Sequence, residues 1–249
     1  MWVIQKNSEF AHQQESFAVR MRSKYIMSAM RDLDDVIGES NSLLTPSGSV
    51  EFCMKAMTSQ GIHPRLVDTY PEPLRGYLHR RVWRSTLREI RGSSDMVFIK
   101  PVNHKVFTGF MWTVDSPHEI ADLPDDLEIY CSDPVTFISE FRYYILNGEI
   151  LGIGRYDDGE DEDEDVTPDI NTVKQSIRDF IGAPSGYAMD FGVMKTYSGD
   201  VSSALVEVND AWGSLGLYSG SMTRDNYVRL VESRWNEMCN ESHPSRLME

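Results

Sequence analysis

Cysteine is scarce in this sequence, and long apolar runs are absent. The three cysteines, Cys53, Cys131 and Cys239, stand far apart in 249 residues, which excludes a disulfide framework and provides no zinc-ligand spacing. No segment approaches the roughly 20 consecutive apolar residues of a membrane span, and the first residues lack the basic and apolar regions of a leader peptide. We therefore expect a soluble, cytoplasmic protein in a reducing compartment, without a membrane partner.

Several familiar catalytic motifs are also missing. The sequence contains no G-x-x-x-x-G-K-[ST] phosphate loop and no H-E-x-x-H motif, and its six histidines show no metal-ligand spacing. Gly152-Ile153-Gly154 lacks the third glycine and the following helix of a dinucleotide fingerprint. Residues 213–221 lack the strand–serine–helix setting of a nucleophile elbow. These absences exclude the commonest phosphate-loop, dinucleotide, zinc-protease and serine-hydrolase solutions.

Negative charge is plentiful but local. The 24 basic and 39 acidic residues give a net charge of −15, and eight of the acids fall within residues 157–165, so the rest of the chain carries −15 + 8 = −7. This balance argues against a nucleic-acid partner, which requires a basic surface. We interpret the acidic run as a solvated loop, with a lid or a partner-binding patch as the alternatives.

The first part of the chain predicts short strands and amphipathic helices. We expect a strand at Trp2–Gln5, a turn at Pro46–Gly48, and a helix from about Ser49 to Gly61 that buries Val50, Met54 and Met57. A second helix is predicted from Leu74 to about Arg91. Its four arginines, at positions 80, 84, 88 and 91, form a stripe that we interpret as a solvated face, with anion binding as the alternative.

From Met96 onwards the apolar pattern changes to the period of two that is typical of strands. Strands are predicted at residues 96–101, 105–114, 127–131, 135–146, 149–156, 186–196 and 202–209, and helices at 169–182 and 224–239. Asn147-Gly148 predicts a tight hairpin turn. The pattern indicates an α+β fold with a mostly antiparallel sheet and segregated helices.

Three oxygen-bearing side chains are predicted to meet on one sheet face. Glu207 and Asn209 alternate in the run "LVEVN", and Asp190 lies one hairpin upstream in "YAMDFGVM". Carboxylate and amide oxygens are ligands that Mg²⁺ accepts. Taken alone, Glu207 and Asn209 also fit an antiparallel strand with one solvated face.

Lys100, Glu140, Arg142 and Arg155 are charged residues within apolar strands. Lys100 ends the run "VFIK" and is either a functional ammonium or an edge lysine that reaches solvent. Glu140 and Arg142 alternate on one face, and the hairpin is expected to bring Arg155 opposite them, either in a site or in a cross-strand ion pair.

In this order, the elements resemble the ATP-grasp superfamily. "VFIKP" is similar to the strand that carries its phosphate-binding lysine, and "DFGV" followed by "LVEVN" is similar to its metal-binding aspartate and Glu-x-Asn strands. The form "FIKP…FTG…SEFRYYILNGEILGIGRY…DFGV…LVEVNDAW" most resembles a small clade of phage and bacterial proteins named for characteristic arginines and a lysine. The resemblance covers about residues 43–235 and implies two α+β subdomains, with mostly antiparallel sheets, that clasp a nucleotide.

The resemblance also implies a domain division and a role for each candidate residue. Residues 1–94 would form a shortened N-terminal region, residues 95–240 the ATP-grasp domain and residues 241–249 a tail. Lys100 and Lys105 would contact ATP phosphates, Tyr130 and Cys131 the adenine through backbone groups, and Asp133 the ribose; Glu140 would complete this nucleotide-binding set. Asp190, Glu207 and Asn209 would hold Mg²⁺, and Arg142 and Arg155 would neutralise charge during transfer.

The implied activity is an ATP- and Mg²⁺-dependent carboxylate–amine ligase that acts through an acyl-phosphate on an amino acid, peptide or protein. A nucleotide-binding module without turnover and a phosphotransferase are the alternatives, and a homo-oligomer is left open. Asp210-Ala211-Trp212 follows the Glu-x-Asn strand in place of the small-Pro-Gly segment of many amino-acid ligases. We therefore expect the determinants of acceptor identity at residues 210–212.

Overall fold

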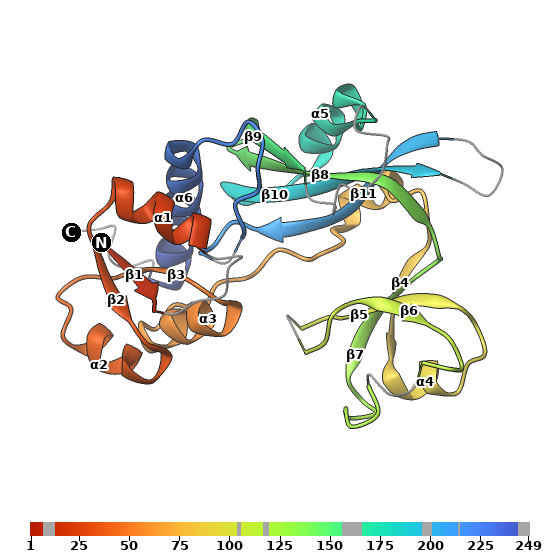
Figure 1. Cartoon of the computed structure of the whole chain (residues 1–249), viewed down its shortest axis with the longest axis horizontal. Coiled ribbons are helices and arrows are strands. Elements are labelled where there is room, and N and C mark those ends of the chain that lie inside the picture. Colours follow the sequence, from red (N-terminus) through yellow and green to blue (C-terminus); the bar gives the residue numbers. More distant parts are fainter. Residues whose placement is uncertain are drawn as a thin grey trace.

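Three β-sheets follow one another along the chain in the computed structural model (Figure 1). The structure describes residues 1–6, 13–103, 106–116, 120–155, 166–195, 201–213 and 215–243. Lys105, the acidic run 157–165 and the turn predicted at residues 198–200 lie outside the described residues. The three sheets are called here the N-terminal, middle and C-terminal sheets.

The N-terminal sheet is parallel, with strand order β2-β1-β3. Its elements are β1 (Trp2–Gln5), α1 (Gln13–Arg22), β2 (Tyr25–Ser28), η2 (Met30–Asp32), α2 (Leu33–Gly38), β3 (Thr45–Ser47) and α3 (Val50–Ser59). The predicted turn at Pro46–Gly48 is wrong, because Pro46 lies in β3 opposite Val3. A proline is tolerated there because β3 is an edge strand, where a missing N–H need not break a ladder.

Helix α3 begins where the sequence predicted, but one residue faces the other way. The Ser49 hydroxyl accepts the Phe52 N–H at 3.2 Å and caps the helix. The buried face consists of Phe52, Cys53, Ala56 and Met57, whereas Met54 is 38% exposed. The predicted inward position of Met54 is therefore wrong, because the aromatic ring of Phe52 sets the packing face.

The middle sheet is antiparallel, with strand order β4-β7-β5-β6. It contains η3 (Glu72–Tyr77), β4 (Val82–Thr86), α4 (Leu87–Arg91), β5 (Val97–Pro101), β6 (Phe110–Trp112) and β7 (Glu128–Ser132). The predicted strand at residues 105–114 is limited to β6 within the described residues. Strand β4 lies before the predicted domain boundary at residue 95, so this sheet draws on both predicted domains.

The helix predicted from Leu74 to Arg91 is wrong, because η3, β4 and α4 divide this segment. His79 has a φ of 51°, which interrupts any continuous helix. Val82-Trp83 continues as a strand, and Thr86 forms a capping box with Glu89 that starts α4. The four arginines of the predicted stripe therefore point to different surroundings.

The C-terminal sheet is antiparallel, with strand order β11-β10-β8-β9. It contains β8 (Thr136–Leu146), β9 (Glu149–Arg155), α5 (Ile170–Asp179), β10 (Gly186–Lys195), β11 (Val201–Asp210) and α6 (Arg224–Ser242). The predicted hairpin turn is confirmed, since Asn147 and Gly148 have φ values of 50° and 80°. Helix α6 extends past its predicted end at Cys239, so the first residues of the predicted tail are helical.

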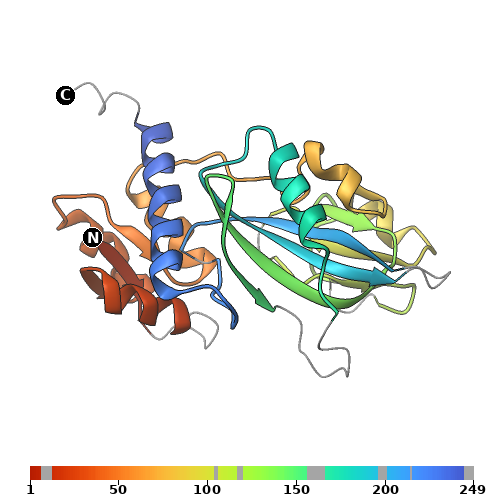
Figure 2. The same cartoon turned by 90° about the horizontal axis from the view of Figure 1, so that it is seen from above.

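Helices cover both faces of the C-terminal sheet. Helix α6 stands between the N-terminal and C-terminal sheets (Figure 2) and packs Tyr227 and Leu230 with Tyr144 and Ala188. On the opposite face, α5 and η3 pack against a cluster that includes Tyr143, Met189 and Phe191. The middle sheet lies at the other end of the molecule, beneath the C-terminal sheet in Figure 1.

The segment after β11 docks onto the N-terminal sheet through two residues. Trp212 is buried in one cluster with Phe52 and Trp235. The Gly213 carbonyl accepts the Gly48 N–H at 3.0 Å, and a Cβ at Gly213 would lie 1.8 Å from the Pro46 carbonyl oxygen. This close approach of two backbones requires glycine.

We expect Gly213→Ala to destabilise the protein by about 1–3 kcal/mol, because the new methyl group overlaps backbone atoms that cannot rotate away. The control is Gly38→Ala in α2, where a Cβ meets nothing within 4 Å and alanine is neutral or stabilising by up to about 1 kcal/mol. Urea unfolding of both variants provides the measurement. Equal stability of the two variants would contradict this packing.

Candidate functional site

A bulge in β9 decides which charged residues share a face of the C-terminal sheet. The hairpin starts with Leu146 opposite Glu149, and continuation without a break would place Glu140 opposite Arg155. The register instead shifts after Ile145, leaving Leu151 unpaired, so Arg155 lies opposite Phe141. A shift of one residue moves a side chain to the other face. The prediction that Arg155 meets Glu140 and Arg142 is therefore wrong.

Close packing explains why the β9 bulge is needed. The shifted register turns Gly152 and Gly154 toward the loop that follows β11. A Cβ at Gly152 would lie 2.5 Å from Met222 Cα, and one at Gly154 would lie 3.0 Å from Tyr218 Cβ. Arg155 instead stacks over the Phe141 ring, with Cζ 5.9 Å from its centroid.

The other face of the C-terminal sheet, called here the site face, gathers the predicted oxygen ligands. Asp190 lies on β10 between Arg142 of β8 and Glu207 of β11. Asn209 follows Glu207 by two residues and shares its face. The predicted meeting of Asp190, Glu207 and Asn209 on one face is confirmed by this register and by the contacts of Asn209. Its Nδ2 donates to Asp190 Oδ2 at 2.9 Å and to Glu207 Oε1 at 3.0 Å.

Asp190 is completely buried and paired with Arg142. The guanidinium donates from Nε to Asp190 Oδ1 at 2.8 Å and from Nη2 to Oδ2 at 2.7 Å. Burial raises the pKa of Asp190 above its usual value, while the positive charge of Arg142 acts in the opposite direction. Arg142 is 4% exposed, also donates to the Leu215 carbonyl, and lies under the Tyr218 ring. Arg142 therefore neutralises Asp190 and has little access to solvent.

Glu207 forms an ion pair with Lys100, which comes from β5 of the middle sheet. Burial acts to raise the pKa of Glu207, but the Lys100 ammonium and the Asn209 amide hold it at about 2. The same pair raises the pKa of Lys100 against the opposing effect of burial. The two side chains are 21% and 18% exposed, and the partners are 107 residues apart in sequence. This contact joins the middle and C-terminal sheets across the site.

Tyr70 and Tyr130 flank Lys100. The Lys100 Nζ lies 5.5 Å from the Tyr70 ring centroid, and Tyr70 meets Tyr130 edge to face at 4.9 Å. The Tyr130 hydroxyl donates to Asp68 at 2.7 Å and accepts from Arg84 at 3.0 Å. Lys100 is therefore held by aromatic rings on its apolar side and by Glu207 at its charged end.

The residues predicted to contact the adenosine lie around β7. Tyr130 and Cys131 are inside this strand, which pairs with β4 on one side and β5 on the other, so their backbone groups belong to the ladder. Asp133 follows the strand and pairs with Arg81 at 2.8 Å. The nucleotide contacts of these three residues stay predictions.

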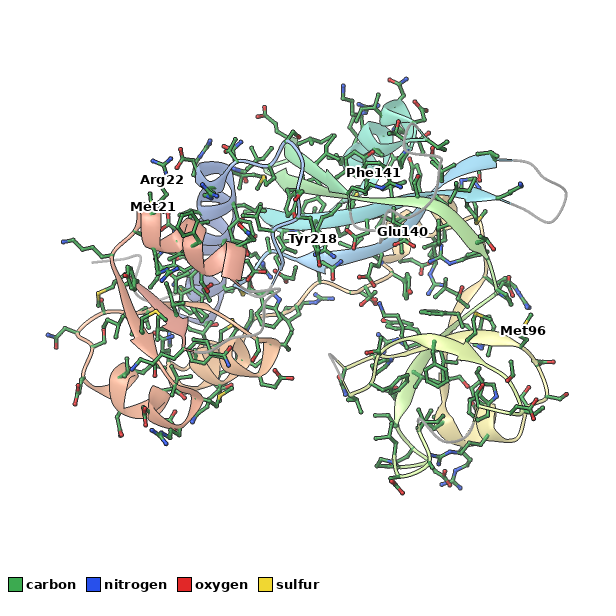
Figure 3. The ribbon with its side chains drawn as sticks, viewed as in Figure 1. Met21, Arg22, Met96, Glu140, Phe141 and Tyr218 are labelled. Carbon is green, nitrogen blue, oxygen red and sulfur yellow. The ribbon has the colours of Figure 1, made fainter. Side chains whose placement is uncertain are left out.

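Glu140 lies on the site face, opposite Gly192. Figure 3 shows Glu140 and Phe141 on β8 and Tyr218 on the loop after β11. Sequence reasoning missed Tyr218, because no pattern in the loop indicated that its ring would cover Arg142. Arg80 was also missed, since the incorrect helix assigned it to a solvated stripe.

Residues 210 and 212 do not face an open site. Asp210 forms a buried ion pair with Arg234 of α6, at 2.7 Å and 2.9 Å, and its Oδ2 accepts the Val67 N–H at 3.1 Å. Trp212 is 4% exposed. The prediction that these side chains select the acceptor is wrong, because both are used to dock β11 onto α6 and the N-terminal sheet.

Two negative observations hold for the part of the chain that the structure describes. No group of three His, Cys, Asp or Glu side chains is placed to hold a metal ion there, so the oxygen set at Asp190 and Glu207 depends on the Asn209 amide. Within the same residues, every helix is too short or too polar to cross a membrane.

Solved structures with a similar fold are ligases. D-alanine–D-alanine ligase from Bacillus anthracis, in complex with ATP, superimposes with a TM-score of 0.59 at 11% identity, covering 96% of this chain and 98% of that chain. Another structure of that ligase gives 0.53 at 12% identity, with coverage of 97% and 98%. The ATP-grasp ligase PsnB with a minimal precursor gives 0.48 at 12% identity, covering 92% and 97%. At these identities the first two likenesses show the fold alone, and no curated protein matches the sequence significantly.

The family itself is shown by a sequence match. The model of an ATP-grasp domain, the second family of the clade named for its arginines and lysine, matches residues 77–230, which is more than half of the chain. The match confirms the resemblance and, with the likeness to D-alanine–D-alanine ligase, the α+β fold expected from it. The chain therefore belongs to the ATP-grasp superfamily, in the second family of that arginine-and-lysine clade.

Proposed function

We propose that this protein is an ATP- and Mg²⁺-dependent ligase that joins a carboxylate to an amine through an acyl-phosphate. The observation that carries the proposal is the ion pair of Lys100 with Glu207, formed between two sheets and next to the buried Asp190. A lysine and a carboxylate that face each other across two subdomains are placed to receive the phosphates and the metal of one nucleotide.

The residues present fit a magnesium ion. Mg²⁺ takes oxygen ligands and is usually bound by one or two carboxylates together with substrate phosphates. Asp190, Glu207 and Asn209 would hold it, because their oxygens meet on the site face. When bound, the ion would neutralise charge on the β- and γ-phosphates. Glu207 is the more accessible carboxylate, whereas Asp190 is enclosed by Arg142 and Asn209.

Lys100 and Glu207 would exchange partners when the nucleotide binds. Lys100 would turn to the phosphates and Glu207 to the metal, so each charge would keep an opposite charge beside it. This exchange avoids leaving a charge unpaired in a partly buried site, which would cost several kcal/mol. Tyr70 would keep its ring against the Lys100 ammonium during the change.

The other predicted residues form the rest of the proposed site. Tyr130, Cys131, Asp133, Glu140 and Lys105 are proposed nucleotide contacts. Arg142 would act through Asp190, because its donors are directed at that carboxylate, and Arg155 is not proposed as catalytic because it lies on the opposite face. The proposed acceptor is an amino acid, peptide or protein.

We expect Glu207→Gln to weaken Mg·ATP binding at least about tenfold, because the amide loses the negative charge that attracts the metal. Lys100→Met should weaken it similarly by removing the phosphate contact. Glu149→Gln, at the exposed start of β9, is the matched control and should bind as the wild type does. Isothermal titration calorimetry makes the measurement. Wild-type affinity in Glu207→Gln and Lys100→Met would refute this site.

We expect ADP and phosphate to appear together only when a carboxylate and an amine are both supplied, because the amine displaces phosphate from the acyl-phosphate. Screening amino acids and short peptides in pairs, with coupled detection of ADP and phosphate, provides the measurement. A phosphorylated product without free phosphate would indicate a phosphotransferase. Tight Mg·ATP binding without ADP release from any pair would favour a nucleotide-binding module.

A further inference from the structure

A second bulge, in β11, makes the proposed metal ligand possible. Glu207 lies opposite Asp190, but the next pair is Leu205 with Phe191, so Val206 is unpaired. Without this bulge, Leu205 would share the face of Glu207. Instead, Leu205 is fully buried in the cluster beneath the sheet, while Glu207 points to the site face. The extra residue therefore separates an apolar anchor from a functional carboxylate.

The bulge is held by Arg80. Its Nη1 donates to the Leu205 carbonyl at 2.8 Å, and its Nη2 donates to the Val206 carbonyl at 2.9 Å. Strand β11 is at the edge of its sheet, so no further strand of that sheet can supply these donors. A guanidinium presents several N–H groups in a rigid fork, which suits two adjacent carbonyls.

The same guanidinium connects β11 to the middle sheet. Its Nε donates to the Ser132 hydroxyl at the end of β7 at 3.1 Å, and its Nη1 also donates to the Leu78 carbonyl at 3.1 Å. Its Cζ lies 5.5 Å from the ring centroid of Phe137, at the start of β8. Arg80 therefore contacts both segments that flank the passage between the two sheets.

We propose that Arg80 is a positioning residue that stabilises the β11 bulge and thereby directs Glu207 into the metal site. The geometry of the bulge rests on the observed hydrogen bonds, whereas the effect on metal binding rests on the proposed function. Arg80 does not contact the metal or nucleotide in this proposal. It acts through the backbone of Leu205 and Val206.

The first test is hydrogen exchange of the ligand-free protein. In Arg80→Met, amides of residues 204–208 should exchange at least about tenfold faster, while amides of Trp2–Gln5 should keep their wild-type rates. Arg80→Lys should recover part of the protection, because an ammonium can reach one carbonyl but lacks the fork. Leu33→Ala, which opens a cavity in the N-terminal cluster, is the control for general instability and should leave residues 204–208 at wild-type rates relative to its own global unfolding. Unchanged exchange at 204–208 in Arg80→Met, or an equal rise throughout the chain, would overturn the proposal.

The second test is calorimetric titration of ATP with and without Mg²⁺. Arg80→Met should reduce the factor by which Mg²⁺ raises ATP affinity by about tenfold, with metal-free affinity almost unchanged, while Leu33→Ala should keep the wild-type factor. An unchanged factor in Arg80→Met would overturn the link to Glu207. If the wild-type protein does not bind Mg·ATP, the proposed function fails, and the exchange experiment still decides whether Arg80 holds the bulge.

Discussion

A fully buried carboxylate must be paired, and this requirement organises the site. Asp190 has no exposed surface, so an unpaired charge there would cost several kcal/mol. Arg142 supplies two hydrogen bonds, and the Asn209 amide supplies a third. Asn209 also donates to Glu207, which in turn pairs with Lys100. One buried charge thus begins a chain of contacts that runs from β8 through the C-terminal sheet to the middle sheet.

Two unpaired residues decide which side chains take part in that chain of contacts. Leu151 shifts β9 so that Arg155 leaves the site face, and Val206 shifts β11 so that Glu207 joins it while Leu205 enters the core. Each bulge has a local cause: loop packing leaves no room for a Cβ at Gly152, and Arg80 supplies donors to the carbonyls of Leu205 and Val206. Because side chains alternate along a strand, one inserted residue has a larger effect than most substitutions.

The site is assembled from segments that are distant in sequence. Lys100 and Glu207 belong to different sheets, and Arg80 connects those sheets again through Ser132 and the β11 carbonyls. Asp210 and Trp212 anchor the end of β11 to α6 and to the N-terminal sheet. All three sheets therefore act on the position of one strand. A ligand that separates Lys100 from Glu207 would change the contact between two of the three sheets.

The amino-acid sequence by itself determined the strand alternation of Glu207 and Asn209, the Asn147-Gly148 turn, the Ser49 cap and the order of elements that identifies the family. These signals are local, since they depend on side-chain period and turn chemistry. Only the tertiary structure decided the face of Arg155, the burial of Asp190 by Arg142, the docking role of Trp212 and the contacts of Arg80. The physical reason is that a bulge, an ion pair between sheets and a buried ring depend on which distant segments lie opposite, and no residue pattern within one segment records its neighbour.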